Sequence, residues 1–331
     1  MKKQLLIAAV AATMTSVAFA DVSITGAAQV NYNNLNSDTA GTADVNTITH
    51  DFDLKITGKS GATSIVMDIE NTDAAADATD LESESNSSTT ADSRAQVKTD
   101  NELNVKNAYM TTAIAGVNVK MGTYYGSDTL LSDGGQTEDK VSLDTTMSGV
   151  KVQYEDDMTD SSVTLSGSVA GLKITHEMFN KADKTDSSVS GTFGGVNAAY
   201  RSISSDTAKS DATSLEVSTD VQGMTVTYAA IDANDDATDA SGVTSDAFFG
   251  TFAKDSEIKE ATGFGVKTSM AGNTVNLKSY STKAATANSV DVDYTKLVVT
   301  RPLASGATAE FTYTDIDNVS TAMDLELRVK F

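Results

Sequence analysis

Residues able to perform nucleophilic or metal chemistry are scarce in this sequence. The 331 residues include no cysteine and two histidines, His50 and His176. The lack of cysteine excludes a thiol-based redox or metal site. Both histidines fall on the apolar side or at the rim of alternating segments, so neither a Ser-His-Asp site nor a histidine metal site is expected. The sequence therefore predicts no enzyme and no cofactor.

One acidic segment superficially resembles the start of a calcium-binding loop. It runs Asp232-Ala233-Asn234-Asp235-Asp236. An EF-hand loop needs glycine at its sixth position and glutamate at its twelfth, and these positions hold Ala237 and Val243. We interpret the segment as a solvated loop and expect no specific metal site.

Charge is the remaining chemical feature, and acidic residues are in large excess over basic ones. The chain has 46 acidic and 24 basic residues, for a formal net charge of −22. Such a surface repels nucleic acid and attracts cations. Nucleic-acid binding is therefore excluded, and small cations are expected partners. A disordered acidic chain has the same composition, but the ordered pattern described next argues against it.

Apolar and polar residues alternate along most of the chain. In the last segment, Met323, Leu325, Leu327, Val329 and Phe331 alternate with Asp324, Glu326, Arg328 and Lys330. The same alternation occurs at 51–56, 64–70, 117–122, 150–155, 214–219 and 290–295. Because successive side chains of a strand point to opposite faces, these segments predict strands with one apolar and one polar face.

Short glycine turns join these segments into hairpins. Six share one form, a small or polar residue followed by glycine: Ala115-Gly116, Ser148-Gly149, Ala170-Gly171, Gly194-Gly195, Gln222-Gly223 and Ala271-Gly272. Glycine supplies the positive φ that tight hairpin turns require. Tyrosines follow several turns, at 124, 154, 200 and 228, where we expect an aromatic girdle at a membrane interface.

Long acidic loops alternate with the short turns, the longest near residues 71–100. This asymmetry is typical of a transmembrane antiparallel β-barrel, and a single proline in the whole chain fits unbroken strands. The fold class is therefore all-β. A direct count gives about 18 strands, with 246–254 ambiguous, so the choice lies between 16 and 18 strands around a water-filled lumen.

The amino terminus has the three parts of a secretory signal. Lys2 and Lys3 precede the apolar run 5–12, and Ala18-Phe19-Ala20 offers a cleavage site. We predict a cleaved signal peptide at 1–20 and a single barrel domain at 21–331. The alternative is an N-terminal membrane anchor, for which the run is too short.

Three stretches resemble the Gram-negative general diffusion porin family. They are 53–71, 106–124 and the segment from Arg301-Pro302-Leu303 to the terminal strand. The resemblance implies a passive outer-membrane channel, a homotrimer, and a terminal Phe331 read by the barrel-assembly machinery. The chain departs from the family in having Thr123 after Gly122, where an arginine is usual, and in lacking tryptophan.

The resemblance also implies a loop that folds inward and narrows the pore. On this chain it is about 126–140, with the acidic residues Asp128, Asp133, Glu138 and Asp139. Strand parity places Lys55, Lys106, Lys120 and Tyr124 opposite it. An acidic loop across from lysines makes a transverse field that selects solutes by charge. The large acidic excess favours a mild cation preference.

Two other functional classes share the signal peptide and the strands. A surface structural or adhesive barrel would lack an open pore, and a barrel enzyme would need a catalytic constellation, which the sequence lacks. A pore requires an apolar, lipid-facing outer band about 25 Å tall, in contact with outer-membrane lipids. A soluble protein would bury that face instead.

Overall fold

The computed structural model describes residues 21–37, 45–72, 103–125, 137–180, 184–205, 211–233, 248–249, 258–284 and 291–331. The predicted signal peptide at 1–20 lies outside these residues. The first described residue, Asp21, already begins a strand. None of the described residues belongs to a helix long and apolar enough to cross a membrane.

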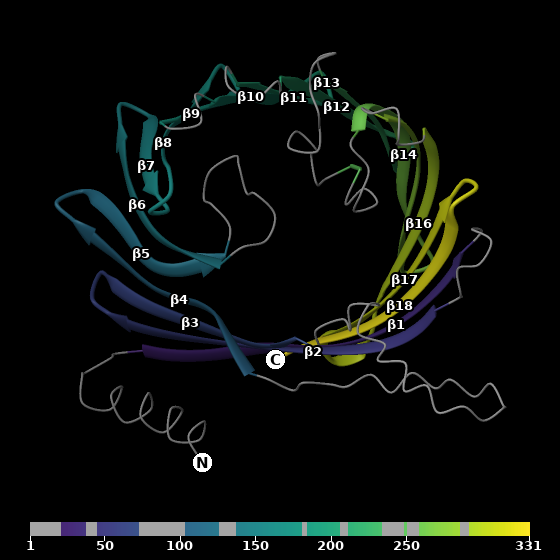
Figure 1. The fold of residues 1–331 in the computed structure, drawn as a ribbon, viewed down its shortest axis with the longest axis horizontal. Coiled ribbons are helices and arrows are strands. Elements are labelled where there is room, and N and C mark those ends of the chain that lie inside the picture. Colours follow the sequence, from purple (N-terminus) through teal and green to yellow (C-terminus); the bar gives the residue numbers. More distant parts are fainter. Residues whose placement is uncertain are drawn as a thin grey trace, which may run out of the picture.

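The described chain is almost entirely β-strand (Figure 1). The strands are β1 (Asp21–Ser37), β2 (Val45–Ser60), β3 (Thr63–Thr72), β4 (Leu103–Ile114), β5 (Val117–Tyr125), β6 (Thr137–Met147), β7 (Val150–Asp156), β8 (Ser161–Val169), β9 (Leu172–Phe179), β10 (Lys184–Phe193), β11 (Val196–Ser205), β12 (Ala212–Val221), β13 (Met224–Ala233), β14 (Ile258–Met270), β15 (Asn273–Ala284), β16 (Val292–Pro302), β17 (Ala307–Ile316) and β18 (Ser320–Lys330). A short 3₁₀ turn, η2 (Ala304–Gly306), joins β16 to β17.

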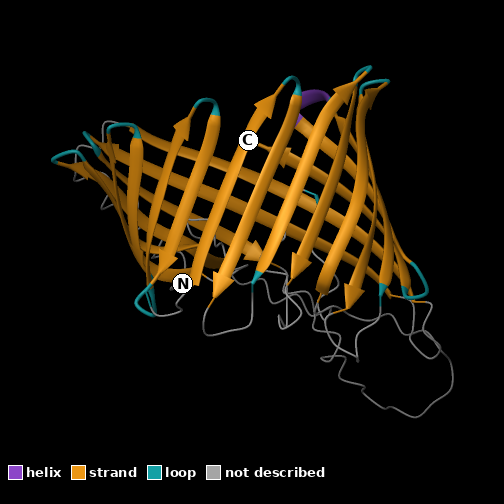
Figure 2. Cartoon of the chain, turned by 90° about the horizontal axis from the view of Figure 1, so that it is seen from above, coloured by secondary structure: helices purple, strands orange, loops and turns teal. Residues whose placement is uncertain are grey.

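Every strand pairs antiparallel with its sequence neighbours, and β1 also pairs with β18. The 18 strands therefore form one closed barrel, which confirms the direct count rather than 16. Closure leaves no unpaired sheet edge, as a spanning sheet requires in lipid. Figure 2 shows the tilted strands around the barrel.

Short turns gather at one end of the barrel (Figure 2), and most of the connections at the other end span more residues. All six predicted turns join consecutive strands, and their central residues have positive φ, as at Ala115 (52°) and Gly116 (84°). Two positive φ values in succession match the hairpin turns whose twist suits paired strands. The predicted asymmetry is confirmed.

The alternating pattern sorts side chains to the two faces of the barrel as predicted. On β18, Leu325 and Leu327 are 52% and 46% exposed on the outer face. The intervening Asp324 and Glu326 lie in register with inner-face residues of β1 and β17. Exposed apolar side chains recur on the outer face of nearly every strand, as a lipid-facing band requires.

The predicted tyrosine girdle is right in part. Tyr154 and Tyr200 are exposed on the outer face, at 38% and 44%. Tyr124 instead lies on the inner face and is 1% exposed. The reason is parity, because Tyr124 shares its face with Lys120 and not with the apolar Met121.

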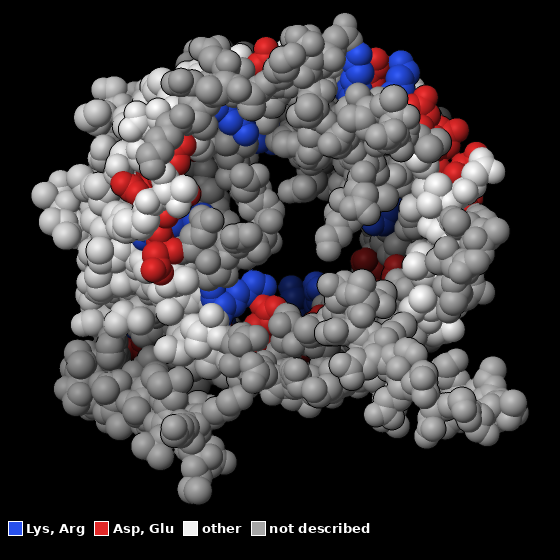
Figure 3. Space-filling view, in the orientation of Figure 1, with Lys and Arg blue, Asp and Glu red and all other residues white. Residues whose placement is uncertain are grey.

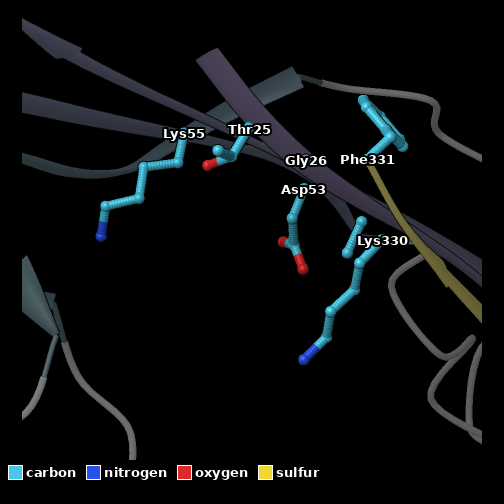
Figure 4. Close-up of a pocket in the computed structure, with 7 residues that line it drawn as sticks. Thr25, Gly26, Asp53, Lys55, Lys330 and Phe331 are labelled. Carbon is cyan, nitrogen blue, oxygen red and sulfur yellow. The ribbon is translucent and has the colours of Figure 1, made fainter. Parts of the chain in front are cut away.

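The last residue completes the barrel seam. The Gly26 nitrogen donates to the Phe331 carbonyl oxygen at 2.9 Å, and the Phe331 nitrogen to the Gly26 oxygen at 3.0 Å. The Phe331 ring stacks on Phe52, with centroids 6.1 Å apart. In Figure 4, Lys55, Asp53 and Lys330 project to one side of the sheet while Phe331 lies on the other.

Candidate pore-lining site

Two lysines surround a buried tyrosine on the inner wall of β5 and β6. The Lys120 Nζ atom lies 3.9 Å from the centroid of the Tyr124 ring and 4.8 Å from that of Tyr109. The Lys140 Nζ atom lies 5.9 Å from the Tyr124 centroid. Cation–π contacts of this kind contribute about 0.5–2 kcal/mol each. We call Lys120, Lys140, Tyr109 and Tyr124 the basic cluster.

Local backbone geometry brings these side chains together. Gly122 lies between Lys120 and Tyr124 with φ of 132°, and a Cβ atom there would sit 2.3 Å from the Ala108 carbonyl oxygen. Only glycine is compatible with both the φ and the close approach. The two tyrosine rings then meet edge to face, with centroids 5.7 Å apart.

The other two predicted lysines are part of an ion-paired row on β2, β3 and β4. Lys55 lies 3.8 Å from an Asp68 carboxylate oxygen, and Asn107 donates to the same carboxylate at 2.8 Å. Lys106 pairs with Glu70 at 2.6 Å. A register shift between Asp68 and Ile69 makes Lys106 an extra residue on β4.

Lys55 also borders a recess at the barrel seam (Figure 4). The recess measures about 470 Å³ and is lined by Thr25, Gly26, Ala27, Asp53, Lys55, Lys330 and Phe331. Its charged members are two lysines and one aspartate. The recess therefore forms a mixed-charge surface beside the barrel seam.

The four predicted acidic residues differ in how far the structure describes them. Asp128 and Asp133 lie outside the described residues. Glu138 is in register with Tyr124 on β6, but its side chain is not described. Asp139 is exposed and accepts a 2.5 Å hydrogen bond from the Thr123 hydroxyl. Asp139 and Thr123 are in register and lie on the face opposite Tyr124, so the register places Asp139 on the outer face of the barrel.

Sequence reasoning did not single out Lys140. It lies in register with Gly122, on the same inner face as Lys120 and Tyr124. Thr123 is in register with Asp139 and lies on the outer face. The alternation of polar and apolar residues at 140–144 places Lys140 on the polar face of its strand. Only the fold shows that Lys140 is in register with Gly122 on β5.

A second missed feature is an acidic region on β7–β10. Glu155, Glu177 and Asp186 are 7%, 0% and 0% exposed, and Glu177 lies in register with Asp186. Arg201 on β11 forms a two-pronged ion pair with Asp186, with Nη2 2.7 Å from Oδ2 and Nε 3.1 Å from both oxygens. Buried carboxylates require such pairing.

A further basic region lies on β14–β16. Lys278 and Lys296 are directly opposite each other across β15 and β16, and Lys267 is on the same inner face of β14. Like charges in register are unfavourable, and a water-filled lumen reduces that cost by screening. Basic and acidic side chains thus alternate around the wall, and both colours border the central opening in Figure 3.

The histidines take no part in this site. His50 is exposed on the outer face, and His176 Nδ1 lies 2.8 Å from the Ser187 hydroxyl. His176 alternates with the inner-face residues Thr175 and Glu177. Within the described ranges, no group of three His, Asp or Glu residues is arranged to hold a metal ion.

Comparison with known proteins identifies the fold. No protein-family model and no curated protein matches the sequence. Acinetobacter baumannii OccAB2 superposes with a TM-score of 0.66 at 11% identity, covering 95% of this chain and 98% of that one. Pseudomonas aeruginosa OpdQ gives 0.61 at 9%, covering 95% and 98%. A mutant of Rh. blastica porin gives 0.55 at 10%, covering 94% and 100%. At these identities the likeness shows the fold: the chain is a closed 18-stranded barrel that resembles these porins in fold.

Proposed function

We propose that this protein is a passive diffusion channel for ions and small hydrophilic solutes across the outer membrane. The observation that carries the proposal is the difference in polarity between the two faces of the barrel. The outer face is apolar and exposed, while the inner face carries lysines, arginine and carboxylates. A polar lumen inside an apolar shell solvates a solute in transit and needs no chemical step.

A mild cation preference is part of the proposal. Acidic residues outnumber basic ones by 46 to 24, and three carboxylates are buried in the wall of β7–β10, of which Asp186 is paired with Arg201 on β11. Each carboxylate raises the local cation concentration within about 8 Å at physiological salt. The basic cluster opposes this effect locally, so the expected preference is small.

The remaining expectations complete the proposal. They are export through a cleaved signal peptide at 1–20, assembly through the C-terminal strand, and a homotrimer in the outer membrane. The constriction is formed by the inward loop at about 126–140 against Lys120 and Tyr124. Lys55 and Lys106 extend the basic side toward β2.

The deciding measurement is single-channel current in a planar bilayer with a tenfold KCl gradient. Steady conductance steps with a cation-signed reversal potential are expected. Steps with an anion-signed potential would retain the channel and assign selectivity to the lysines. Folded, heat-modifiable protein that never conducts would instead favour a structural or adhesive barrel without an open pore.

Neutralising the basic cluster is expected to increase cation selectivity. One positive charge 8 Å from a permeating ion in water contributes about 0.5 kcal/mol, and screening over one Debye length lowers this to about 0.2 kcal/mol. Each lysine acts with opposite sign on a cation and an anion, so Lys120→Met with Lys140→Met is expected to raise the cation-to-anion permeability ratio by about 2- to 5-fold. Reversal potentials in the same gradient measure this ratio.

The matched control removes the same charge elsewhere in the wall. Lys59 and Lys173 are exposed residues near the short-turn ends of β2 and β9. Lys59→Met with Lys173→Met is expected to change the ratio much less. Equal effects of the two double variants would show that the basic cluster has no special place along the permeation path.

A further inference from the structure

The described inner wall includes an apolar area that a water-filled lumen does not explain. It comprises Ile203, Ala212, Ala229, Ile231, Ala233, Ala261, Tyr280 and Tyr294 on β11–β16, with Val292 and Ile316 at its edge. The strand registers place these residues on the same face as Lys278 and Glu216. We call them the apolar seat.

Phe248 and Phe249 occupy the apolar seat. They belong to the connection between β13 and β14, and they are 2% and 3% exposed. Their rings meet edge to face at 4.9 Å, and Phe249 meets Tyr280 in the same way at 5.5 Å. Tyr280 stacks on Tyr294 at 4.6 Å with 10° between the ring planes. Four aromatic rings therefore pack in sequence across three elements.

The wall is shaped to receive the Phe248 ring. A Cβ atom on Gly265 would lie 2.9 Å from Phe248 Cε2, while its other neighbours are at 3.5 Å and beyond. A Cβ atom on Gly263 would lie 2.8 Å from Phe248 Cε1. The two glycines of β14 thus leave space that the ring fills. Side chains of ordinary size at these positions would displace it.

A polar contact holds the backbone of the same residue. Lys278 Nζ donates to the Phe248 carbonyl oxygen and lies 5.1 Å from the centroid of the Phe248 ring. Phe248 is therefore held through its ring by the apolar seat and through its carbonyl by an ammonium group. Two phenylalanines released into the lumen would expose their rings to water, which is unfavourable.

The seat lies across the barrel from the basic cluster. β14 is halfway around the 18-stranded ring from β5, and both features lie toward the end with the long connections. We propose that Phe248 and Phe249 form an aromatic anchor on the inner wall that sets the open cross-section of the pore opposite Lys120 and Lys140. This role rests on the proposed channel function.

The anchor is tested from both sides of the contact. Phe248→Ala with Phe249→Ala removes the rings, and Gly265→Ala fills the space beneath one ring without altering either phenylalanine. Both variants are expected to give larger or noisier single-channel currents than the steady wild-type steps. Adding Gly265→Ala to the double alanine variant is expected to have no further effect, because its target ring is gone.

Gly167→Ala is the matched control. It is also a strand glycine, but an added Cβ atom there meets nothing nearer than 3.4 Å, so wild-type currents are expected. Wild-type conductance and noise in both the Gly265→Ala and the double alanine variants would overturn the anchor while leaving the channel intact.

A second readout measures anchoring independently of conduction. The chain has no cysteine, so Ala229→Cys introduces a single thiol at a seat position that is 1% exposed. We expect a water-soluble maleimide to label it severalfold faster when both phenylalanines are alanine. Asp53→Cys, at an exposed inner-wall position, controls for general access. Equal labelling of Ala229→Cys in the two backgrounds would overturn the anchor even if the wild-type barrel did not conduct.

Discussion

Replacing Arg201 with methionine is expected to lower the free energy of unfolding by about 3–5 kcal/mol. Asp186 is fully buried and accepts three hydrogen-bond contacts from the Arg201 guanidinium, between 2.7 and 3.1 Å. Methionine keeps most of the side-chain volume but leaves the carboxylate without this cation, next to Glu177. The loss is measured as a lower midpoint of urea or heat unfolding of the refolded barrel.

Two controls separate charge from packing. Arg328 is 45% exposed at its side chain and pairs with Glu326, so Arg328→Met is expected to cost about 1 kcal/mol or less. Asp186→Asn combined with Arg201→Met removes both charges and is expected to recover part of the loss. If Arg201→Met and Arg328→Met proved equally mild, the buried pair would not contribute to stability as argued.

Disrupting the barrel seam is expected to have the largest effect on assembly. Phe331 supplies the last pair of β1–β18 backbone hydrogen bonds and stacks on Phe52. Deleting Phe331, or replacing it with aspartate, leaves a gap or a charge at the outer face, where a lipid-exposed Arg or Lys at mid-bilayer costs about 2–4 kcal/mol, an Asp or Glu costs less, and the cost falls toward the interface. We expect a strong reduction in heat-modifiable, folded barrel in the membrane fraction.

Gly26 provides a second way to disturb the same seam. A Cβ atom on Gly26 would lie 2.6 Å from two Phe331 ring carbons and 2.9 Å from the Asp53 carbonyl oxygen. Gly26→Ala is therefore expected to lower folded yield, whereas Phe331→Tyr and Gly167→Ala are expected to preserve it. Normal folded yield after loss of Phe331 would refute the assembly role of the terminal residue.

Local sequence determined which residues form strands and which face each side chain takes. Along β18 the alternation of Met323 to Phe331 predicted both faces correctly, because the two-residue period of a strand is a local property. The glycine turns were predictable for the same reason, since a positive φ at Gly116 or Gly149 is required by the turn itself. The all-β class and the turn–loop asymmetry follow from these local features.

Tertiary structure decided which strands meet and in what register. Lys140 joins Tyr124 because β6 pairs with β5 across residues 126–136, and the same register turns Asp139 outward. Lys106 reaches Glu70 because of a register shift between β3 and β4, which no local sequence pattern predicts. Closure at 18 strands, rather than 16, depends on how all the hairpins associate.

The apolar seat is the clearest example of a feature that the sequence alone could not predict. Its members come from strands between Ile203 on β11 and Tyr294 on β16, and each strand contributes between one and three inward residues that look unremarkable alone. Phe248 and Phe249 lie in a segment whose sequence was ambiguous between strand and loop. Their burial arises only when six neighbouring strands bring small and aromatic side chains to one surface. That surface is a property of long-range pairing, so the sequence by itself determined the barrel and its faces, and only the folded chain decided what lines the lumen.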